Sequence, residues 1–373
     1  MKKTVLILYA NMGKGHISAT NATKEALEHL YGDKINIEIV DFFSLVSGIF
    51  SRTVEAAYDG SVKYLPAFYK TFFDLTDAPW PVKFLNTMNY PMLNTAMKKV
   101  LKETDPDLII STYPIWDYGI AQVWKKKHPK AKFLNIITDS IYIHHAWLVA
   151  DADYRIVPNE DTAKVLMDKG VDSEKIKILG FPVNMEFTKP SNKDETLKKL
   201  DLNPKLFTIL LFATVGNNRR NLKIFEKIIY EKRDYNVICV TGRNETIMPK
   251  IEHLREEKNV AIMGWTPNVP DLIKASDLII TKAGGATVME CISVEKPMII
   301  TQVIPGQEEG NAELIRKHNL GVILKKGNKD IERLPSIISD MRKDYSKYLK
   351  GLKEHSKPDA AINIAKFVAK LLD

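Results

Sequence analysis

The amino-acid sequence predicts an α/β fold built from two doubly wound, Rossmann-like domains. A chain of 373 residues is too long for one ordinary hydrophobic core, which suggests two domains. In the front half, an apolar run at residues 4–10 leads into a glycine-containing loop and then into a helical pattern. Residues 277–294 repeat that order in the rear half. Strand, glycine turn and helix in succession are typical of a parallel sheet that binds ligands at the carboxyl ends of its strands.

Composition places the chain among globular proteins, with 45% hydrophobic and 27% charged residues. Cys239 and Cys291 stand in apolar stretches and predict buried thiols in a reducing compartment. The net charge of +8 is spread along the chain, which favours an anionic membrane surface or another polyanion over a dedicated nucleic-acid groove. No apolar run is long enough to span a bilayer, and the short N-terminal run indicates a strand rather than a signal peptide.

His16 is the most informative residue of the first predicted unit. Residues 4–10 and 35–41 read as strands, and apolar residues between 19 and 30 mark one face of a helix. His16 stands at the start of that helix, beside glycines that leave it sterically open. The positive end of a helix lowers the proton affinity of an imidazole, which suits a general base. A histidine that merely caps the helix is an equally good interpretation of this loop.

Residues 42–93 hold a large share of the aromatic side chains, interleaved with lysines and cut by prolines into short helices. An apolar, aromatic face with basic neighbours is how a peripheral protein enters a membrane interface. We therefore expect a lipid-facing surface, although the same residues could pack an elaborated helical layer. The residues expected on this surface are Phe42, Phe43, Phe68, Phe72 and Trp80.

Polar side chains follow a further strand of the first domain, predicted at residues 132–139. Asp139 closes this strand and could orient a histidine or act as the base itself. His144 follows and could bind the acceptor or a phosphate. We expect no metal site, because no third ligand has useful spacing. The other strands of this domain are predicted at residues 107–112, 154–158 and 176–179.

A polar stretch at residues 189–203 reads as the linker to the second domain. Loops that follow strands there are candidate donor contacts. Gly216 and Arg243 could lie by a diphosphate, and a nucleobase could lie against the backbone near Gly264 and Trp265. The strands are predicted at residues 207–215, 235–241, 260–264, 277–281, 297–303 and 321–324, with a last apolar helix at 358–372.

The stretch around Gly284 and Gly285 is the strongest anion-binding signal. It places backbone N–H groups and a helix N-terminus after a buried strand. Glu290 lies three residues after Thr287, so a hydroxyl near the phosphate and a carboxylate near ribose project on one side. A threonine can also cap such a helix without any ligand. A second polar cluster at residues 305–311 follows the next strand.

Taken in order, these motifs resemble the family of bacterial diacylglycerol glucosyltransferases and plant monogalactosyldiacylglycerol synthases, relatives of the glycosyltransferase MurG. The motifs lie at residues 13–16, 138–139, 180–183, 282–290 and 305–311. The resemblance implies a GT-B fold, with an acceptor domain at 1–188 and a donor domain at 204–355 facing a cleft. It also implies that a helix at 356–373 packs back on the first domain.

The resemblance further implies an inverting transfer of a hexose from a UDP-sugar to diacylglycerol or a glycosyldiacylglycerol. The partners would be the donor, the lipid and an anionic membrane surface, on the cytoplasmic face of the cell membrane and without nucleic acid. No cofactor and no essential metal are expected. The matched residues are His16 as base with Asp139 as orienter or alternative base, Gly284, Gly285 and Thr287 at the diphosphate, Glu290 at ribose, and Gln307, Glu308 and Asn311 in the motif that holds sugar hydroxyls.

Three other interpretations remain open from the sequence. A UDP-GlcNAc 2-epimerase would share the two-domain architecture but leave residues 42–93 unexplained. A MurG-like UDP-GlcNAc transferase would use a polyprenyl-linked acceptor, although the glycine-richer first loop of that enzyme is absent here. A non-catalytic module that binds sugar nucleotides or lipids would make His16 and Asp139 spectators.

Overall fold

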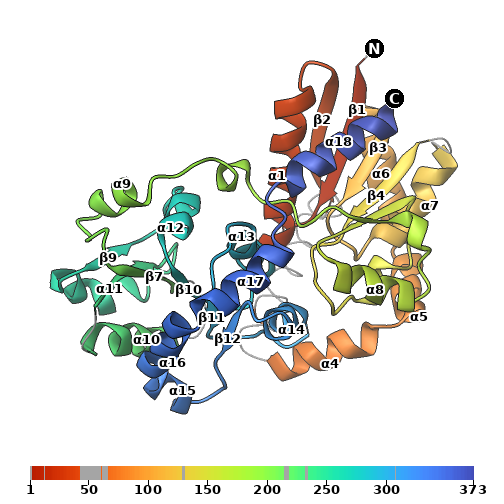
Figure 1. The fold of residues 1–373 in the computed structure, drawn as a ribbon. Helices are drawn as coiled ribbons and strands as arrows, with labels where there is room; N and C mark the ends of the chain where they lie inside the picture. Colours follow the sequence, from red (N-terminus) through yellow and green to blue (C-terminus); the bar gives the residue numbers. More distant parts are fainter. Residues whose placement is uncertain are drawn as a thin grey trace. The chain divides into compact units, whose positions relative to one another are not determined.

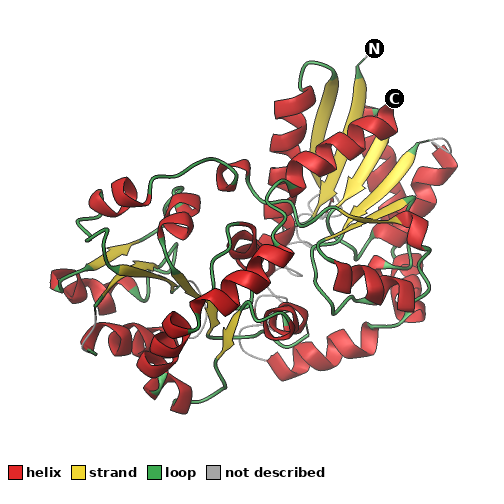
Figure 2. Cartoon of the chain, viewed as in Figure 1, coloured by secondary structure: helices red, strands yellow, loops and turns green. Residues whose placement is uncertain are grey.

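The computed structural model describes residues 2–11, 13–42, 60, 66–127, 131–213, 218–231, 234–306 and 308–373. The chain forms two compact units, each with its own sheet (Figure 1). The first unit contains Met1–Met185, Ile304–Asn311 and Lys357–Asp373, and the second contains Glu186–Val303 and Ala312–Ser356. The alternation of strands and helices in both units is evident in Figure 2. The predicted pair of Rossmann-like α/β domains is therefore confirmed.

The first unit is organised around a six-stranded parallel sheet in the order β2-β1-β3-β4-β5-β6. Its strands are β1 (Lys3–Tyr9), β2 (Ile35–Asp41), β3 (Leu108–Ser111), β4 (Lys132–Ile136), β5 (Tyr154–Val157) and β6 (Ile176–Ile178). The order reverses between β1 and β3, because the chain builds outward in opposite directions from these two strands. Such a switch point is where doubly wound sheets bind ligands, at the carboxyl ends of the strands.

Helices cover both faces of this sheet. On one face α1 (Lys14–Tyr31) and α18 (Ala360–Leu372) pack together, as Figure 1 also shows. Their contact is rich in small residues such as Ala22, Ala26 and Ala365, which allow the helix axes to approach closely. On the other face lie α6 (Tyr90–Thr104) and α7 (Asp117–Lys127), whose apolar side chains form a second core. Because both faces are covered, β3 is buried along its whole length.

Gly180 explains how the end of the chain approaches the sheet. Its φ of 98° is in the left-handed region, which favours glycine. A Cβ at this position would stand 2.7 Å from Cβ of Ala360 and 3.0 Å from Cβ of Lys357. Only a residue without a side chain therefore fits where α18 begins.

Two short helices, α4 (Pro66–Thr76) and α5 (Pro79–Met88), precede α6 in the first unit. The prolines near the start of α5 suit the first turn of a helix, where the backbone N–H has no intrahelical partner. The remaining elements of this unit are α8 (Glu160–Asp168), η1 (His145–Trp147) and η2 (Ser173–Lys175), and η3 (Met185–Phe187) lies at the boundary, with only Met185 in this unit. No helix in the described part of the chain is long and apolar enough to cross a membrane.

The second unit has a six-stranded parallel sheet in the order β12-β11-β10-β7-β8-β9. Its order reverses between β7 and β10, so a second switch point lies where these two strands end. The strands are β7 (Phe207–Phe212), β8 (Tyr235–Val240), β9 (Val260–Met263), β10 (Leu278–Thr281), β11 (Met298–Ile300) and β12 (Gly321–Ile323).

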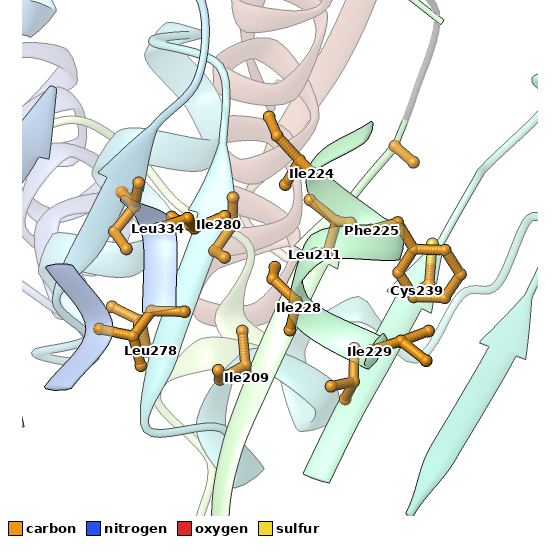
Figure 3. Close-up of a cluster of buried hydrophobic side chains, with 14 of the residues drawn as sticks. Ile209, Leu211, Ile224, Phe225, Ile228, Ile229, Cys239, Leu278, Ile280 and Leu334 are labelled. Atoms are coloured by element: carbon orange, nitrogen blue, oxygen red, sulfur yellow. The ribbon is translucent and has the colours of Figure 1, made fainter. Parts of the chain in front are cut away.

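The core of the second unit forms where α10 (Asn218–Tyr230) lies on the sheet. Ile224, Phe225 and Ile228 share one face of α10 and pack against Ile209 and Ile280 from the strands (Figure 3). This spacing of apolar residues is that of an amphipathic helix. The other helices are α9 (Lys193–Lys198), α11 (Met248–Ile251), α12 (Val269–Ala275), α13 (Gly285–Ser293), α14 (Glu309–Lys317), α15 (Lys329–Glu332), α16 (Leu334–Lys343) and α17 (Tyr345–His355), with η4 (Glu252–Glu256).

Both cysteines are free and buried, as predicted. Cys239 belongs to the core shown in Figure 3, and burial raises its pKa to about 12. The residues interpreted as a linker belong to the second unit. There Lys193 donates to both carboxylate oxygens of Asp277, at 2.6 and 2.7 Å.

Candidate functional site

His16 lies in the first turn of α1, at the switch point of the first sheet. Its Nδ1 is 2.7 Å from the carbonyl oxygen of Thr112 and 2.9 Å from Oγ1 of Thr138. Thr112 follows β3 and Thr138 follows β4, so residues after neighbouring strands meet on one imidazole. The N-cap of α1 is Gly13, without a side-chain cap. The interpretation of His16 as a helix cap is therefore wrong.

The hydrogen bonds of His16 fix the state of its ring. A carbonyl oxygen only accepts, so Nδ1 carries the proton and donates it to Thr112. In the neutral ring Nε2 then holds the lone pair. Burial lowers the pKa of His16, while the nearby Asp139 and the Thr112 carbonyl act in the opposite direction. The neutral imidazole with a lone pair on Nε2 is the state that a general base requires.

The surroundings of His16 differ from the open environment expected beside glycines. The exposed fraction of the residue is 5%. The ring of Tyr113 meets the imidazole edge-on at a centroid distance of 4.9 Å, and the ring of Trp147 lies at 6.2 Å. Aromatic side chains from later loops thus fill the space that the small residues leave.

Asp139 lies beside His16, as predicted for the second catalytic candidate. Its Oδ2 accepts a hydrogen bond of 2.7 Å from the indole Nε1 of Trp147. Burial raises the pKa of Asp139, and His16 and the indole N–H counteract this rise. The structure therefore places an imidazole and a carboxyl group close enough to interact electrostatically. The sequence analysis gave no role to Trp147, although a tryptophan shortly after a strand-end aspartate is a signal that could have been used.

A buried polar network supports the turn that carries Trp147. Asp117 accepts from Oγ of Ser111 and from Nδ2 of Asn135, both at 2.6 Å, and burial raises its pKa to about 7. Arg155 interacts electrostatically with Asp117 and donates to the carbonyl of Trp147 at 3.3 Å. Further bonds from Arg155 reach the carbonyls of Leu148 and Ala150, at 3.2 and 2.5 Å. Sequence reasoning missed this network, because each member stands alone in an apolar strand or helix.

His144 is bound on both ring nitrogens. Its Nδ1 accepts from the backbone N–H of Ala146 at 3.1 Å, and its Nε2 lies 3.3 Å from Oγ1 of Thr76. The ring also packs against Phe73 at 4.7 Å. Burial lowers the pKa of His144, which favours the neutral form. A role as phosphate or acceptor ligand stays a prediction, and it would require His144 to exchange one of these bonds.

The predicted lipid-facing residues differ in their exposure where the structure describes them. Phe72 and Trp80 are exposed, at 56% and 72%. Phe42 is buried in the core formed by α6, α7 and the sheet, so its prediction is wrong. It directly follows β2, where an apolar side chain continues the sheet core. Phe43 lies outside the described residues, and so does the side chain of Phe68 in α4.

Exposed apolar side chains gather on α4 and α5. We name this set the α4–α5 apolar face: Phe72, Leu75, Trp80, Phe84, Leu85 and Met88. Trp80, Phe84 and Met88 follow one another at intervals of four residues and therefore form a stripe along α5. Soluble proteins rarely leave such a stripe uncovered unless it meets a partner or a membrane.

In the second unit, α13 begins directly after β10 at the switch point. Its N-cap is Gly284, which offers no side chain to the first N–H groups of the helix. The interpretation of Thr287 as the cap of this helix is therefore wrong. Free N–H groups and the positive end of a helix are features that favour the binding of an anion.

Glu290 lies on α13, one turn after the N-terminus. Among the residues that the structure describes, none forms a hydrogen bond or ion pair with its carboxylate. Burial raises the pKa of Glu290 to about 7. Glu290 is of intermediate exposure, so a ligand that donates hydrogen bonds can reach its carboxylate.

Arg243 and Trp265 come together after β8 and β9. The guanidinium carbon of Arg243 lies 5.9 Å from the ring centroid of Trp265, whose exposed fraction is 63%. Gly264 precedes this tryptophan, and a Cβ there would meet only the oxygen of Gly242 and a terminal methyl group of Met248. The backbone at Gly264 is thus accessible from its Cα side. Three of the predicted donor residues therefore share one edge of the second sheet.

A ring of polar side chains joins the start of α10 to the residues that follow β8. Asn244 donates to the carbonyl of Ala213 at 3.1 Å and to Oδ1 of Asn218 at 2.8 Å. Thr246 donates to Oδ1 of Asn244 at 2.8 Å. Gly216 lies outside the described residues. Sequence reasoning missed this ring.

The predicted sugar-binding loop is described in part. Gln307 lies outside the described residues. Glu308 is buried, and its Oε2 accepts from the backbone N–H of Ile304 at 3.0 Å. Asn311 is also buried. Both belong to the first unit, unlike the other donor candidates. Within the described part of the chain, no cluster of three histidine, cysteine or acidic residues could hold a metal ion.

Comparison with known proteins gives two family matches along the chain. Residues 16–183 match the model for monogalactosyldiacylglycerol (MGDG) synthase. Residues 218–368 match the glycosyltransferase family 28 C-terminal domain. Together these matches contain His16, Asp139 and the donor residues from Arg243 to Asn311.

Relatives along the full length agree with these matches. The probable monogalactosyldiacylglycerol synthase 2 of Oryza sativa subsp. japonica is 26% identical, over 99% of this chain and 81% of its own length. The processive diacylglycerol beta-glucosyltransferase of Bacillus licheniformis is 25% identical, over 94% of this chain and 91% of its own. Among solved structures, Acinetobacter baumannii MurG matches with a TM-score of 0.61 and 13% identity, covering 99% of each chain. That similarity shows a shared fold.

Proposed function

Because the chain belongs to the glycosyltransferase family of the monogalactosyldiacylglycerol synthases, we propose that it transfers a hexose from a UDP-sugar to diacylglycerol or a glycosyldiacylglycerol. The observation that supports this reaction most directly is the state of His16. Its Nδ1 donates to Thr112, and the neutral ring keeps a lone pair on Nε2. A base in this state can accept the proton of a lipid hydroxyl group as its oxygen attacks the anomeric carbon.

Asp139 assists the base in this proposal. A carboxylate near the ring stabilises the imidazolium that forms when Nε2 takes the proton, as the coupling between the two groups implies. Trp147 keeps this carboxylate in place through the indole N–H. The two groups act together, with His16 as the proton acceptor and Asp139 as the stabilising charge.

The second unit binds the donor in this proposal. The leaving UDP gains negative charge during transfer, and the N–H groups at the start of α13 stabilise it, together with Arg243. The carboxylate of Glu290 accepts hydrogen bonds from ribose hydroxyl groups. The accessible backbone at Gly264 and the exposed ring of Trp265 receive the nucleobase. No step of this scheme requires a metal ion.

The α4–α5 apolar face gives the enzyme access to a lipid acceptor. Its six exposed apolar side chains have a neighbour in the exposed Lys83, which could meet an anionic headgroup. We propose that this face docks at an anionic membrane surface and keeps the enzyme at the cytoplasmic side of the cell membrane. An epimerase that acts on a free sugar nucleotide would not need such a face.

A donor and acceptor screen tests the proposal. The protein is incubated with radiolabelled UDP-glucose, UDP-galactose or UDP-GlcNAc and with vesicles that contain diacylglycerol or a polyprenyl-linked acceptor. Label in a glycosyldiacylglycerol supports the proposal and identifies the hexose. Label in the polyprenyl lipid, a free epimerised sugar, or binding without turnover would instead support the MurG-like, epimerase or binding-module interpretation.

A further inference from the structure

Asp77 connects the α4–α5 apolar face to residues 139–147, which carry Asp139 and Trp147 and which we name the catalytic loop. It lies in the turn between the two helices. Its Oδ1 accepts two hydrogen bonds from His145, one from the backbone N–H and one from the ring Nδ1, both at 2.7 Å. Nζ of Lys169 lies 3.8 Å from Oδ2. The pKa of Asp77 is lowered overall. Burial alone would raise it, but the hydrogen bonds from His145 and the charge of Lys169 outweigh the effect of burial.

His145, the hydrogen-bond partner of Asp77, belongs to the same short helix as Trp147, which binds Asp139. His145 begins the single-turn helix η1, and Trp147 ends it. The indole of Trp147 donates to Asp139, which is coupled to His16. Only two peptide bonds therefore separate His145, which binds Asp77, from Trp147, which positions the carboxylate of Asp139.

The conformation of this loop depends on its anchors. Ile141 has a φ of 58°, in the left-handed region that a β-branched residue strongly disfavours. Its backbone N–H donates to Oγ1 of Thr162, and Arg155 binds the carbonyl of Trp147. Asp77 is a further anchor of this loop. It is a charged residue, and it comes from the turn between α4 and α5. A loop with such a residue keeps its shape only when the surrounding structure imposes it.

Other contacts join the same two elements. Thr76 and Phe73, both from the last turn of α4, contact His144 next to Asp77's partner. Their neighbours Phe72 and Leu75 are exposed on the apolar face. One helical turn of α4 therefore contacts the catalytic loop with some residues and presents others to the surface.

We propose that Asp77 is a positioning residue for sugar transfer. Its carboxylate holds η1 so that Trp147 keeps Asp139 beside His16, and it thereby couples the α4–α5 apolar face to the catalytic pair. The inference rests on the proposed function for its kinetic consequence. Its structural consequence, the placement of the Trp147 indole, can be tested whatever the substrate is.

The first experiment compares Asp77→Asn, Asp77→Ala and Asp74→Asn in the full chain. Asp74 is an exposed aspartate one turn earlier on α4, where it pairs with Lys70. We expect turnover with diacylglycerol vesicles to fall about tenfold or more in Asp77→Ala, because small displacements of catalytic groups are costly. The affinity for UDP should not change, since the residues proposed to hold the diphosphate, ribose and nucleobase lie in the other unit. Asp77→Asn keeps an acceptor for the backbone N–H of His145 and should lose less. Wild-type turnover in Asp77→Ala would overturn the proposal.

A double-mutant cycle asks whether Asp77 acts through Trp147. Trp147→Phe removes the indole N–H that holds Asp139. If the two residues act along one path, adding Asp77→Ala to Trp147→Phe should lower turnover less than about twofold further. Fully additive losses would overturn the proposed path.

A spectroscopic experiment separates this inference from the proposed function. The experiment uses NMR on protein whose tryptophans carry an NMR-active nitrogen isotope in the indole ring. The indole N–H resonance of Trp147 is assigned by its absence from the spectrum of Trp147→Phe. It should move in Asp77→Ala and stay in place in Asp74→Asn. If no sugar donor is used but the resonance moves, the proposed function fails and the positioning role stands. An unmoved resonance in folded Asp77→Ala would overturn the role.

Discussion

The indole N–H of Trp147 donates to the carboxylate of Asp139 across 2.7 Å. This bond links a residue after the fourth strand of the first sheet to a short helix eight positions later in the chain. Burial and this bond act in opposite directions on the pKa of Asp139. Burial raises the pKa, whereas the bond stabilises the charged carboxylate and lowers it. The bond therefore helps to determine whether a charged carboxylate stands beside His16.

Replacement of His16 by alanine should abolish the proton transfer but keep the donor site. We expect turnover to fall by about 10²–10⁴, which is the usual contribution of one positioned base. The affinity for UDP, measured by calorimetry, should stay unchanged. His29→Ala is the matched control, because His29 is exposed near the other end of the same helix. Near-normal turnover in His16→Ala would assign the base to another group.

The pH dependence of the reaction should reveal the same residue. Burial lowers the pKa of His16, so the ring stays neutral at pH values where an exposed histidine is partly charged. Activity requires the neutral ring, and kcat/KM should therefore fall on the acidic side with an apparent pKa below about 6.5. A rate that increases on acidification through that range would contradict the assignment of His16 as base.

Glu290 should make UDP binding depend on pH. Its pKa is raised to about 7 by burial, so the accepting carboxylate becomes dominant only above neutral pH. UDP affinity should be higher at pH 8 than at pH 6. Glu290→Gln should weaken binding by about tenfold at pH 8, because it removes a charge-assisted acceptor, and should abolish this pH dependence. The exposed Glu256→Gln serves as the control in the same unit.

The apolar stripe of α5 should govern membrane binding. Trp80→Ala combined with Phe84→Ala removes two exposed aromatic side chains. Sedimentation with anionic vesicles should show a loss of binding of about tenfold or more, in line with the apolar area removed. Tyr230→Ala removes an exposed aromatic side chain from the second unit and should bind as the wild type does. Equal binding by all variants would argue against this docking surface.

Asp117 should make the stability of the first unit depend on pH. Its folded pKa of about 7 lies above the ordinary value of 3.8, so the folded state binds the proton more tightly than the unfolded state. The stabilisation is complete below the unfolded pKa and is lost as the pH rises through 7. Asp117→Asn should therefore give a thermal midpoint that varies less between pH 5 and pH 8. Scanning calorimetry at both pH values measures this difference.

The sequence predicted those parts of the fold and site that depend on contiguous residues. Continuous apolar runs such as β3 and β10 mark strands buried on both faces, and Gly284 marks the start of α13. His16 and Asp139 were found because each follows a strand, and parallel strands present their carboxyl ends at one edge of a sheet.

The parts that the sequence did not reveal depend on contacts between distant residues. Phe42 resembles its aromatic neighbours in composition, and only the packing of α6 and α7 shows that it belongs to the core. The enclosure of His16 comes from Tyr113 and Trp147, which are far away in the chain. Asp77 and His145 are 68 positions apart, and no local pattern links them.

The return of α18 to the first unit affects the order in which the chain can fold. All of the second unit precedes residue 357 in the chain, whereas the face of α1 that α18 covers is completed only by residues 357–373. On the ribosome, the second sheet can therefore be finished while the first still exposes its alanine-rich helix surface. Synthesis from the N-terminus usually lets the first domain fold first, and this topology delays its completion until α18 has been synthesised.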